Sequence, residues 1–172
     1  MNPDIHIRLG QPSDTNVIAA LATQVWLHTY ATTGITTDIA DYILAELNPR
    51  KYQGILNDPA SQLFVAEHGN SLVGFAVVKV VIPRPSGAES AAELQTLYVQ
   101  AHFLGGGIGK SLLRAAETSA RARSGEVLWL TVNAQNAGAI AFYQHLGYTK
   151  VGTTYFILGK GRYENHVLIG HG

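Results

Sequence analysis

The sequence predicts an α/β fold built as a single domain over residues 1–172. Strand-like segments, whose apolar residues alternate or run continuously, take turns along the chain with segments whose apolar residues recur at helical spacing. The length fits one domain with a sizeable core, and neither an internal repeat nor a linker interrupts it. A strand, a glycine turn and a helix at residues 97–113 carry most of the functional information.

The composition narrows the classes of function. Lys and Arg number 12, as do Asp and Glu, so zero formal net charge favours neither nucleic acid nor an anionic membrane as partner. The absence of cysteine excludes disulfides, cysteine nucleophiles and thiolate metal sites. The seven histidines form no H-x-H or H-E-x-x-H motif, so we expect no catalytic metal. With no signal peptide and no apolar stretch long enough to span a bilayer, we expect a soluble cytoplasmic protein.

The first half of the chain predicts a strand, three helices and a hairpin. The expected ranges are 5–9 for the strand, 12–30, 37–47 and 49–57 for the helices, and 61–67 and 72–81 for the hairpin strands. Ser13 or Asp14 is expected to cap the first helix, and the segment 36–38 the second. The proline-rich segment 83–87 predicts a loop.

The second half predicts alternating strands and helices, followed by an antiparallel pair. The expected ranges are 93–99 for a strand, 108–124 for a helix, 127–132 for a buried strand, 139–146 for a short helix, and 151–158 and 163–169 for the final pair, joined by 159–162. Gly147 is expected to end the short helix as its C′ residue, a position that favours glycine.

The glycine turn predicts a binding site for a phosphate group. Four glycines open the helix, at positions 105, 106, 107 and 109. The first turn of a helix presents unpaired N–H groups and partial positive charge, and glycines let a ligand approach the backbone closely. The P-loop pattern fails at Leu104 and the dinucleotide fingerprint fails at Lys110, each by one residue. An ordinary glycine-rich turn is the structural alternative.

A third pattern fits this turn better. The stretch resembles motif A of the GNAT N-acetyltransferase superfamily, [Q/R]-x-x-G-x-[G/A] after a "YV" strand, with Gly107 and Gly109 at the glycine positions. Leu104 stands where the family usually has Arg or Gln, so one side-chain contact to the pyrophosphate is missing. The segment from Asn136 to Tyr143, completed by 147–148, resembles motif B of the same superfamily.

The resemblance implies a fold and an activity. It implies a mixed, mostly antiparallel central sheet with a splayed parallel pair and helices on both faces. It also implies transfer of an acetyl group from acetyl-CoA to a primary amine of a small molecule by direct attack. The cofactor-binding residues that it implies are Leu97, Tyr98, Val99, Leu104, Gly105, Gly106, Gly107, Ile108, Gly109, Lys110, Asn136, Ala139 and Tyr143.

Individual residues receive roles by the same resemblance. The N–H group of Val99 is expected to stabilise the oxyanion, Tyr143 to act as general acid, and Glu93 to act as general base, directly or through water. Each has a structural alternative, since Tyr143 could be a core aromatic residue and Glu93 a surface charge. Asn136 could simply be a helix cap.

The acceptor site is expected between the first two helices and the last hairpin loop. Its expected lining is Trp26, Tyr30, Ile35 and Tyr155, and the region 25–30 is similar to GNATs that act on small amines, including the spermidine/spermine type. Three alternatives remain open: a non-catalytic acyl-CoA sensor, acetylation of a peptide or protein amine, and nucleotide binding at Gly109-Lys110-Ser111. A homodimer is compatible with this function.

Overall fold

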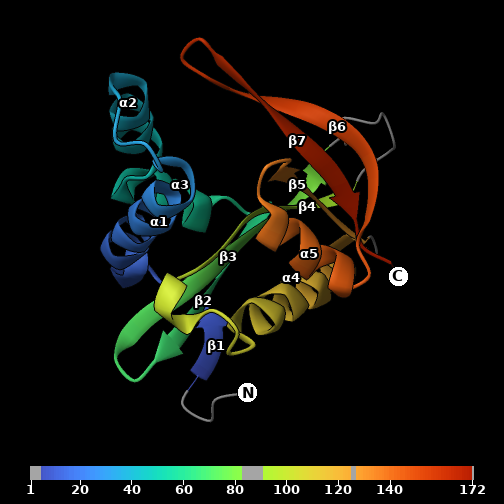
Figure 1. Cartoon of the computed structure of the whole chain (residues 1–172). Helices are drawn as coiled ribbons and strands as arrows, with labels where there is room; N and C mark the ends of the chain where they lie inside the picture. Colours follow the sequence, from blue (N-terminus) through green and yellow to red (C-terminus); the bar gives the residue numbers. More distant parts are fainter. Residues whose placement is uncertain (1–4, 83–90, 125–126, 172) are drawn as a thin grey trace. The chain divides into compact units, whose positions relative to one another are not determined.

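The structure is a computed structural model that describes residues 5–82, 91–124 and 127–171 (Figure 1). Seven strands form a sheet in the order β1-β2-β3-β4-β5-β7-β6. The strands are β1 (Ile5–Leu9), β2 (Ser61–His68), β3 (Ser71–Ile82), β4 (Ala91–Val99), β5 (Leu128–Asn133), β6 (Thr149–Leu158) and β7 (Gly161–Ile169). The β4–β5 pair is parallel, whereas the β1–β2, β5–β7 and β6–β7 pairs are antiparallel. The predicted mixed α/β sheet is confirmed.

Five α-helices and two 3₁₀ turns complete the described elements. They are η1 (Pro12–Asp14), α1 (Thr15–Tyr30), α2 (Thr37–Glu46), α3 (Pro49–Asn57), η2 (Ala101–Phe103), α4 (Ile108–Ser124) and α5 (Ala137–His145). Side-chain oxygens cap three of the helices, since Thr36, Asn48 and Asn136 accept from the N–H group three residues on. Gly147 has φ +90°, as expected for the residue that follows α5.

The predicted cap of the first helix is confirmed in position but not in its hydrogen bond. Asp14 is the N-cap residue of α1, yet its side chain accepts no hydrogen bond from the N–H groups of that helix. Asp14 instead accepts two hydrogen bonds from the Arg8 guanidinium, at 2.8 and 3.0 Å, and one from the N–H group of Gln11 at 2.8 Å. The Arg8 bonds hold the pKa of Asp14 below its ordinary value. A two-pronged contact between two charged groups is stronger than a single bond to an uncharged backbone N–H group, so the carboxylate faces Arg8.

One loop prediction also needs correction. The final turn is shorter than predicted, because β7 begins at Gly161 and only Gly159 and Lys160 connect it to Leu158. The segment between β4 and α4 has the predicted bounds, 100–107, and contains the short 3₁₀ turn η2, which was not predicted. The predicted loop at 83–87 lies outside the described residues.

The described chain divides into two compact units, which we describe separately. Unit 1 holds residues up to Val77 together with Thr96–Ala116, and unit 2 holds Val78–Gln95 together with the chain from Glu117 onward. Strands β3 and β4 therefore contribute residues to both units. In the ranges that the structure describes, no helix combines the length and apolar character needed to cross a membrane.

Unit 1 is built around the helices that precede β2. Helix α1 packs against α3, and α3 packs against β2. The buried cluster beneath them contains Ile18, Ala19, Leu21, Ala22, Tyr52, Leu63, Val65, Phe75 and Val77. Rings of Tyr52 and Tyr98 both meet the ring of Phe75 edge-on, with centroids 5.6 and 5.5 Å apart. The end of β4 is thereby fixed to this core.

Unit 2 is built around β5 and the long hairpin of β6 and β7, drawn in orange and red in Figure 1. Strand β5 pairs with β7 over five residues, from Trp129 opposite Ile169 to Asn133 opposite Asn165. Trp129, Val167 and Ile169 form a small buried cluster. The Tyr148 hydroxyl donates to Oε1 of Glu117 at 2.9 Å, so the start of β6 is tied to α4.

Candidate active site

The glycine turn of unit 1 has the geometry of an anion site. Gly105 and Gly107 have φ of +79° and +82°, a region that glycine enters at little cost. The N–H group of Ser111 donates to the Gly107 carbonyl at 3.0 Å, so α4 takes up its helical pairing from Gly107. Unpaired N–H groups at this end therefore meet the positive end of a 17-residue helix.

The amides that remain available are those of Gly105 to Lys110. In the part of the chain that the structure describes, none of these six N–H groups has a hydrogen-bond acceptor. The N–H group of Leu104 differs, because it donates to the Ala101 carbonyl at 3.2 Å within the η2 turn. The Leu104 side chain is 67% exposed, so nothing packs it into the core. A phosphate site at this turn consequently depends on backbone groups.

The end of β4 contributes its backbone. The Tyr98 ring faces Phe75 in the core of unit 1, so this ring packs in the core rather than against a ligand. A Cβ atom at Gly74 would lie 2.8 Å from the Tyr98 carbonyl oxygen. Strand β3 therefore needs glycine at this position, where the neighbouring strand β4 comes close. Leu97 and Val99 flank Tyr98 and are half-buried.

The parallel pair in unit 2 stops pairing early. The β4–β5 ladder has three pairs, which end with Leu94 opposite Leu130. Strand β5 nevertheless continues to Asn133 with its full pairing to β7. The β4 side of β5 therefore has unpaired backbone at its carboxyl end, the end of parallel strands where ligands commonly bind.

Glu93 lies within this short ladder, directly opposite Trp129. Its side chain is half-buried, and burial raises the pKa of the carboxyl group above its ordinary value. The Gln95 amide donates to Oε2 of Glu93 at 3.3 Å and, together with the charge of Lys79, acts in the opposite direction. A carboxylate with a raised pKa is a stronger base than an exposed one, which suits general-base chemistry near neutral pH.

Tyr143 lies on α5 and is 7% exposed. Its ring packs against Phe142 and Tyr148, with centroid distances of 5.1 and 5.6 Å. The Asn136 side chain accepts from the N–H group of Ala139 at 3.0 Å, so it does cap α5, and that N–H group already has a partner. These contacts fix the helix that carries the Tyr143 hydroxyl.

An aromatic cluster in unit 1 contains two of the predicted acceptor residues. The Trp26 ring lies 4.9 Å from that of Tyr30 and 5.0 Å from that of Tyr42. Burial raises the pKa of both tyrosines, which are therefore neutral phenols at physiological pH. Trp26 is only 4% exposed, so it is the buried member of the cluster. Ile35 is 63% exposed on the loop before α2.

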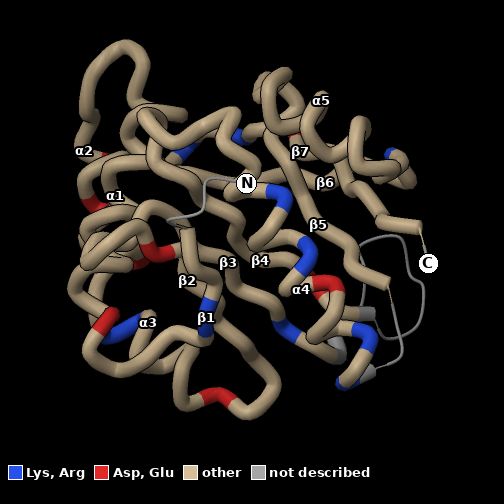
Figure 2. Tube along the Cα trace, turned by 90° about the horizontal axis from the view of Figure 1, so that it is seen from below, with Lys and Arg blue, Asp and Glu red and all other residues tan. Residues whose placement is uncertain are grey.

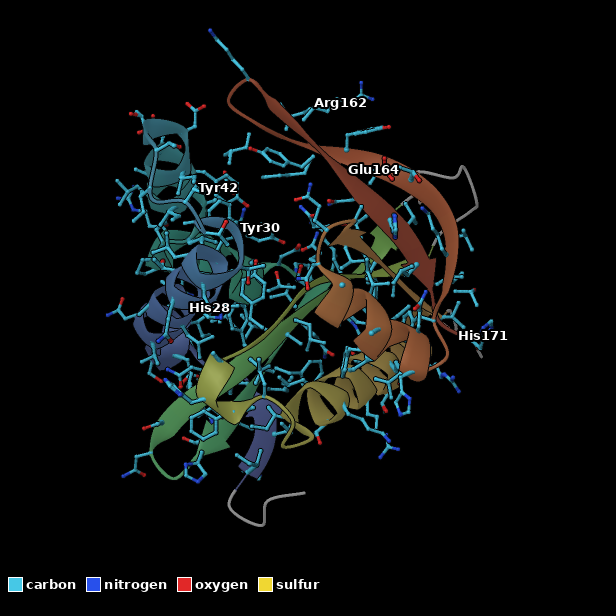
Figure 3. All side chains as sticks on the ribbon, viewed as in Figure 1. His28, Tyr30, Tyr42, Arg162, Glu164 and His171 are labelled. Atoms are coloured by element: carbon cyan, nitrogen blue, oxygen red, sulfur yellow. The ribbon has the colours of Figure 1, made fainter. Side chains whose placement is uncertain are left out.

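Sequence patterns did not single out Tyr42 as a site residue, because its spacing on α2 is that of a core position. The signal that could have found it is its chemistry, a third large aromatic residue on the helix after Trp26 and Tyr30. Tyr155 belongs to unit 2, where the Arg162 guanidinium lies 3.6 Å above its ring centre. Figure 3 shows Arg162 and Glu164 on β7, from which both side chains extend.

Among the residues that the structure describes, charged side chains form no extended run. Figure 2 shows blue and red segments separated by long tan stretches along the trace. Among the residues that the structure places, no three His, Cys, Asp or Glu side chains are close enough together to hold a metal ion.

Comparison with known proteins identifies the family. The model of the acetyltransferase (GNAT) family matches residues 25–148. The chain belongs to this family. An N-acetyltransferase from Lactobacillus delbrueckii subsp. lactis, encoded in the pepI 3′ region, is 25% identical over 165 residues that cover 94% of this chain and 95% of the relative. This GNAT acetyltransferase is thus an N-acetyltransferase with acetyl-CoA as its cosubstrate.

Solved structures share the fold. The PaiA N-acetyltransferase of Thermoplasma acidophilum, in complex with coenzyme A, superposes with a TM-score of 0.80 at 22% identity, covering 98% of this chain and 99% of that chain. The ribosomal-protein-alanine N-acetyltransferase of Brucella melitensis gives 0.71 at 24% identity, with coverage of 95% and 98%. The predicted fold class and family are therefore both confirmed.

Proposed function

We propose that the protein acetylates a primary amine of a small molecule by direct attack on acetyl-CoA. The observation that carries this proposal is Glu93, a half-buried carboxylate with a raised pKa on the strand that leads to the glycine turn. An alkylamine with a pKa near ~10.4 is protonated at neutral pH, so its attack requires a base. Glu93 supplies that base, directly or through one water molecule.

The remaining groups act in sequence around the thioester. The six amides from Gly105 to Lys110 bind the pyrophosphate, and the main chain of Leu97 and Val99 holds the pantetheine arm. Once the amine has lost its proton, its nitrogen attacks the carbonyl carbon, and the Val99 N–H group donates to the oxyanion. The C–S bond then breaks, and Tyr143 gives its phenolic proton to the departing sulfur. The acetylated nitrogen gives up its second proton to solvent, and Tyr143 and Glu93 return to their starting protonation states by exchange with solvent. The products are the N-acetylated amine and coenzyme A.

The aromatic cluster supports a small acceptor. Neutral phenol and indole rings attract a cation through their faces and exclude water from its alkyl part. Tyr30 and Tyr42 both present half-exposed rings beside the buried Trp26. An alkylammonium group can therefore contact the exposed parts of the Tyr30 and Tyr42 rings.

A second candidate is acetylation of a peptide or protein amine. The exposed Tyr155 with Arg162 stacked on it favours this alternative, since an extended chain needs contacts on a surface hairpin. The name of the Brucella neighbour, a ribosomal-protein-alanine N-acetyltransferase, points the same way. A non-catalytic acyl-CoA sensor is the third possibility.

One experiment separates these candidates. Release of the coenzyme A thiol is followed with acetyl-CoA and a panel of small amines, beside a panel of peptides with free N-termini. Turnover of a small amine with the higher kcat/KM supports the proposal, and preference for a peptide supports the second candidate. Tight coenzyme A binding by calorimetry without turnover of any amine supports the sensor.

A further inference from the structure

A hydrogen bond between two glutamine side chains joins helix α1 to the end of strand β4 within unit 1. Nε2 of Gln100 donates to Oε1 of Gln24 at 2.8 Å, and the two residues are 76 positions apart in the chain. Gln24 lies on α1, and Gln100 is the residue that follows β4. The bond therefore connects two elements that have separate parts in the proposed reaction.

The Gln100 end of this bond lies beside the main chain that is proposed to hold the thioester. Gln100 follows Val99, whose N–H group is the proposed oxyanion donor, and consecutive Cα atoms are ~3.8 Å apart. The N–H group of Gln100 donates to the Val73 carbonyl at 2.9 Å, so its backbone is held by β3. The ring of Tyr98 packs against Phe75 in the core of unit 1. These contacts fix the main chain at the end of β4.

The Gln24 end of the bond belongs to the helix that carries the aromatic cluster. Trp26 and Tyr30 follow Gln24 by two and six residues on α1, which corresponds to ~3 and ~9 Å along the helix axis. The Trp26 ring contacts the rings of Tyr30 and Tyr42. Any movement of α1 along or about its axis would therefore displace the rings that are proposed to bind the acceptor.

Apolar contacts and this hydrogen bond hold α1 in different ways. The buried cluster beneath the helix contains Leu21 and Ala22, and Val25 and Tyr98 pack against it. The hydrophobic effect that drives such packing is not directional, whereas a hydrogen bond depends on both distance and angle. The bond between Gln24 and Gln100 consequently adds a directional restraint on the position of α1 relative to the end of β4.

We propose that the hydrogen bond between Gln24 and Gln100 positions the acceptor amine against the thioester, because it fixes α1 relative to the end of β4. Both glutamines are positioning residues, and neither one touches a reacting atom. This inference rests on the proposed binding of a small amine at the aromatic cluster of unit 1. Small displacements of that cluster matter, since a misplacement of about 1 Å can lower a rate by about 10²-fold.

The main test compares two classes of amine in the unsubstituted protein and in Gln24→Leu. Alkylamines long enough to contact the aromatic cluster are compared with methylamine, which is too small to contact the cluster while it attacks the thioester. We expect Gln24→Leu to lower kcat for the longer amines by roughly 10- to 100-fold, with kcat/KM for methylamine and the Kd of coenzyme A within about twofold. Equal losses for both classes of amine would place the damage at the thioester itself and overturn the inference.

A double-mutant cycle shows whether the two side chains act as one contact. If they do, Gln100→Leu should cause the same loss of kcat as Gln24→Leu, and the double variant should lose no more than either single variant. Losses that multiply in the double variant would refute the bond as the positioning element. Gln24→Glu keeps an oxygen that accepts from Gln100, so it should retain most of kcat, but not when combined with Gln100→Leu.

Stability measurements separate positioning from a general structural role. The bond between Gln24 and Gln100 is exposed, so Gln24→Leu should leave Tm nearly unchanged. Gln53→Leu is the matched control, because Nε2 of Gln53 donates to Oδ1 of Asn57 at 3.2 Å in another exposed bond, within α3. We expect Gln53→Leu to change neither Tm nor kcat. A loss of kcat in Gln53→Leu as large as that in Gln24→Leu would contradict the inference.

The outcomes also distinguish this inference from the function on which it rests. If the unsubstituted protein acetylates small amines and Gln24→Leu keeps kcat for the longer ones, the inference is refuted and the proposed function stands. If the unsubstituted protein acetylates no small amine, the proposed function fails and the inference fails with it.

Discussion

The Tyr148 hydroxyl donates a 2.9 Å hydrogen bond to the carboxylate of Glu117, which joins the residue after Gly147 to helix α4. Tyr148 is buried, and its ring contacts the ring of Tyr143. Tyr143, the candidate general acid on α5, therefore packs against Tyr148, whose hydroxyl makes a separate structural hydrogen bond.

Replacing Tyr148 by Phe should lower stability and spare the chemistry. The hydroxyl loses a bond to a charged acceptor, so the free energy of unfolding should fall by about 1–3 kcal/mol. Burial raises the pKa of Tyr148, so its contribution is complete below the unfolded value near ~10 and is lost as pH rises further. Urea unfolding at neutral and alkaline pH checks both points. Equal stability of the two proteins at neutral pH would contradict the first.

Tyr143→Phe should have the opposite signature. If Tyr143 protonates the leaving sulfur, kcat should fall by roughly 10- to 10³-fold while Tm and coenzyme A affinity stay nearly constant. Steady-state kinetics and thermal melting give kcat and Tm from one preparation. Tyr148→Phe is the matched control, because it also removes one buried phenolic hydroxyl. A stable Tyr143→Phe variant with full kcat would refute the general-acid role.

Gly107→Glu should abolish coenzyme A binding. The new carboxylate would stand among the amides of the anion site and repel the pyrophosphate. Gly69→Glu is the matched control, since Gly69 also has positive φ, +58°, but lies in the turn between β2 and β3. Both variants place a glutamate at positive φ and so carry a similar backbone strain. Calorimetry should therefore show that only the variant at position 107 loses its affinity for coenzyme A. Intact affinity in Gly107→Glu would remove the phosphate site from this turn.

Leu104→Arg should strengthen coenzyme A binding. The leucine side chain is largely exposed, so its replacement costs no core packing. A guanidinium bond to phosphate is worth about 1.5–3 kcal/mol, and less at an exposed position, so we expect a several-fold lower Kd in low salt. The gain should shrink as ionic strength rises. An unchanged Kd in low salt would mean that the side chain at 104 points away from the pyrophosphate.

Glu93→Gln should lower kcat/KM most at neutral pH. Because the raised pKa of Glu93 brings its titration closer to neutrality, activity in the unsubstituted protein should climb with pH as the carboxylate forms. The difference in kcat/KM between Glu93→Gln and the unsubstituted protein should become smaller at alkaline pH, where free amine is abundant. Gln95→Ala is a second test of the base. Loss of the Gln95 bond should raise the pKa of Glu93 further and so move the acidic limb of the pH–activity profile to higher pH. Parallel pH profiles would exclude Glu93 as base.

Local patterns were enough to predict most elements of this fold. The Thr36 cap, the Gly147 stop and the glycines before α4 each depend on neighbouring residues, and each is present as expected. Asp14 does occupy the N-cap position of α1, but it makes no cap bond there because a partner on another element, Arg8, bonds the same carboxylate. Propensity describes what a residue prefers locally, and a long-range ion pair can override that preference.

The sequence supplied candidate site residues only where a motif spans them. Motif resemblance pointed to Gly107 and Tyr143, but nothing in the sequence placed Tyr42 beside Trp26. The buried Oδ1 atom of Asn165, which has no hydrogen-bond partner among the described residues, could not be foreseen either, because its surroundings depend on the register of two strand pairs. A shift by one residue would turn that side chain to the opposite face.

The way the chain passes between its two units constrains its synthesis. It begins in unit 1, enters unit 2 at Val78, returns at Thr96, and leaves again at Glu117. When the ribosome has synthesised the chain up to Val77, unit 1 still lacks its second segment, Thr96–Ala116. Unit 2 cannot be completed until the final third of the chain has been synthesised. Nascent β3 and β4 therefore emerge with unpaired edges, the state in which strands most readily associate with the wrong partner. A premature stop after Ala116 would remove β5 and leave the outer edge of β4 open permanently, so such truncations should be found among aggregates rather than among folded fragments.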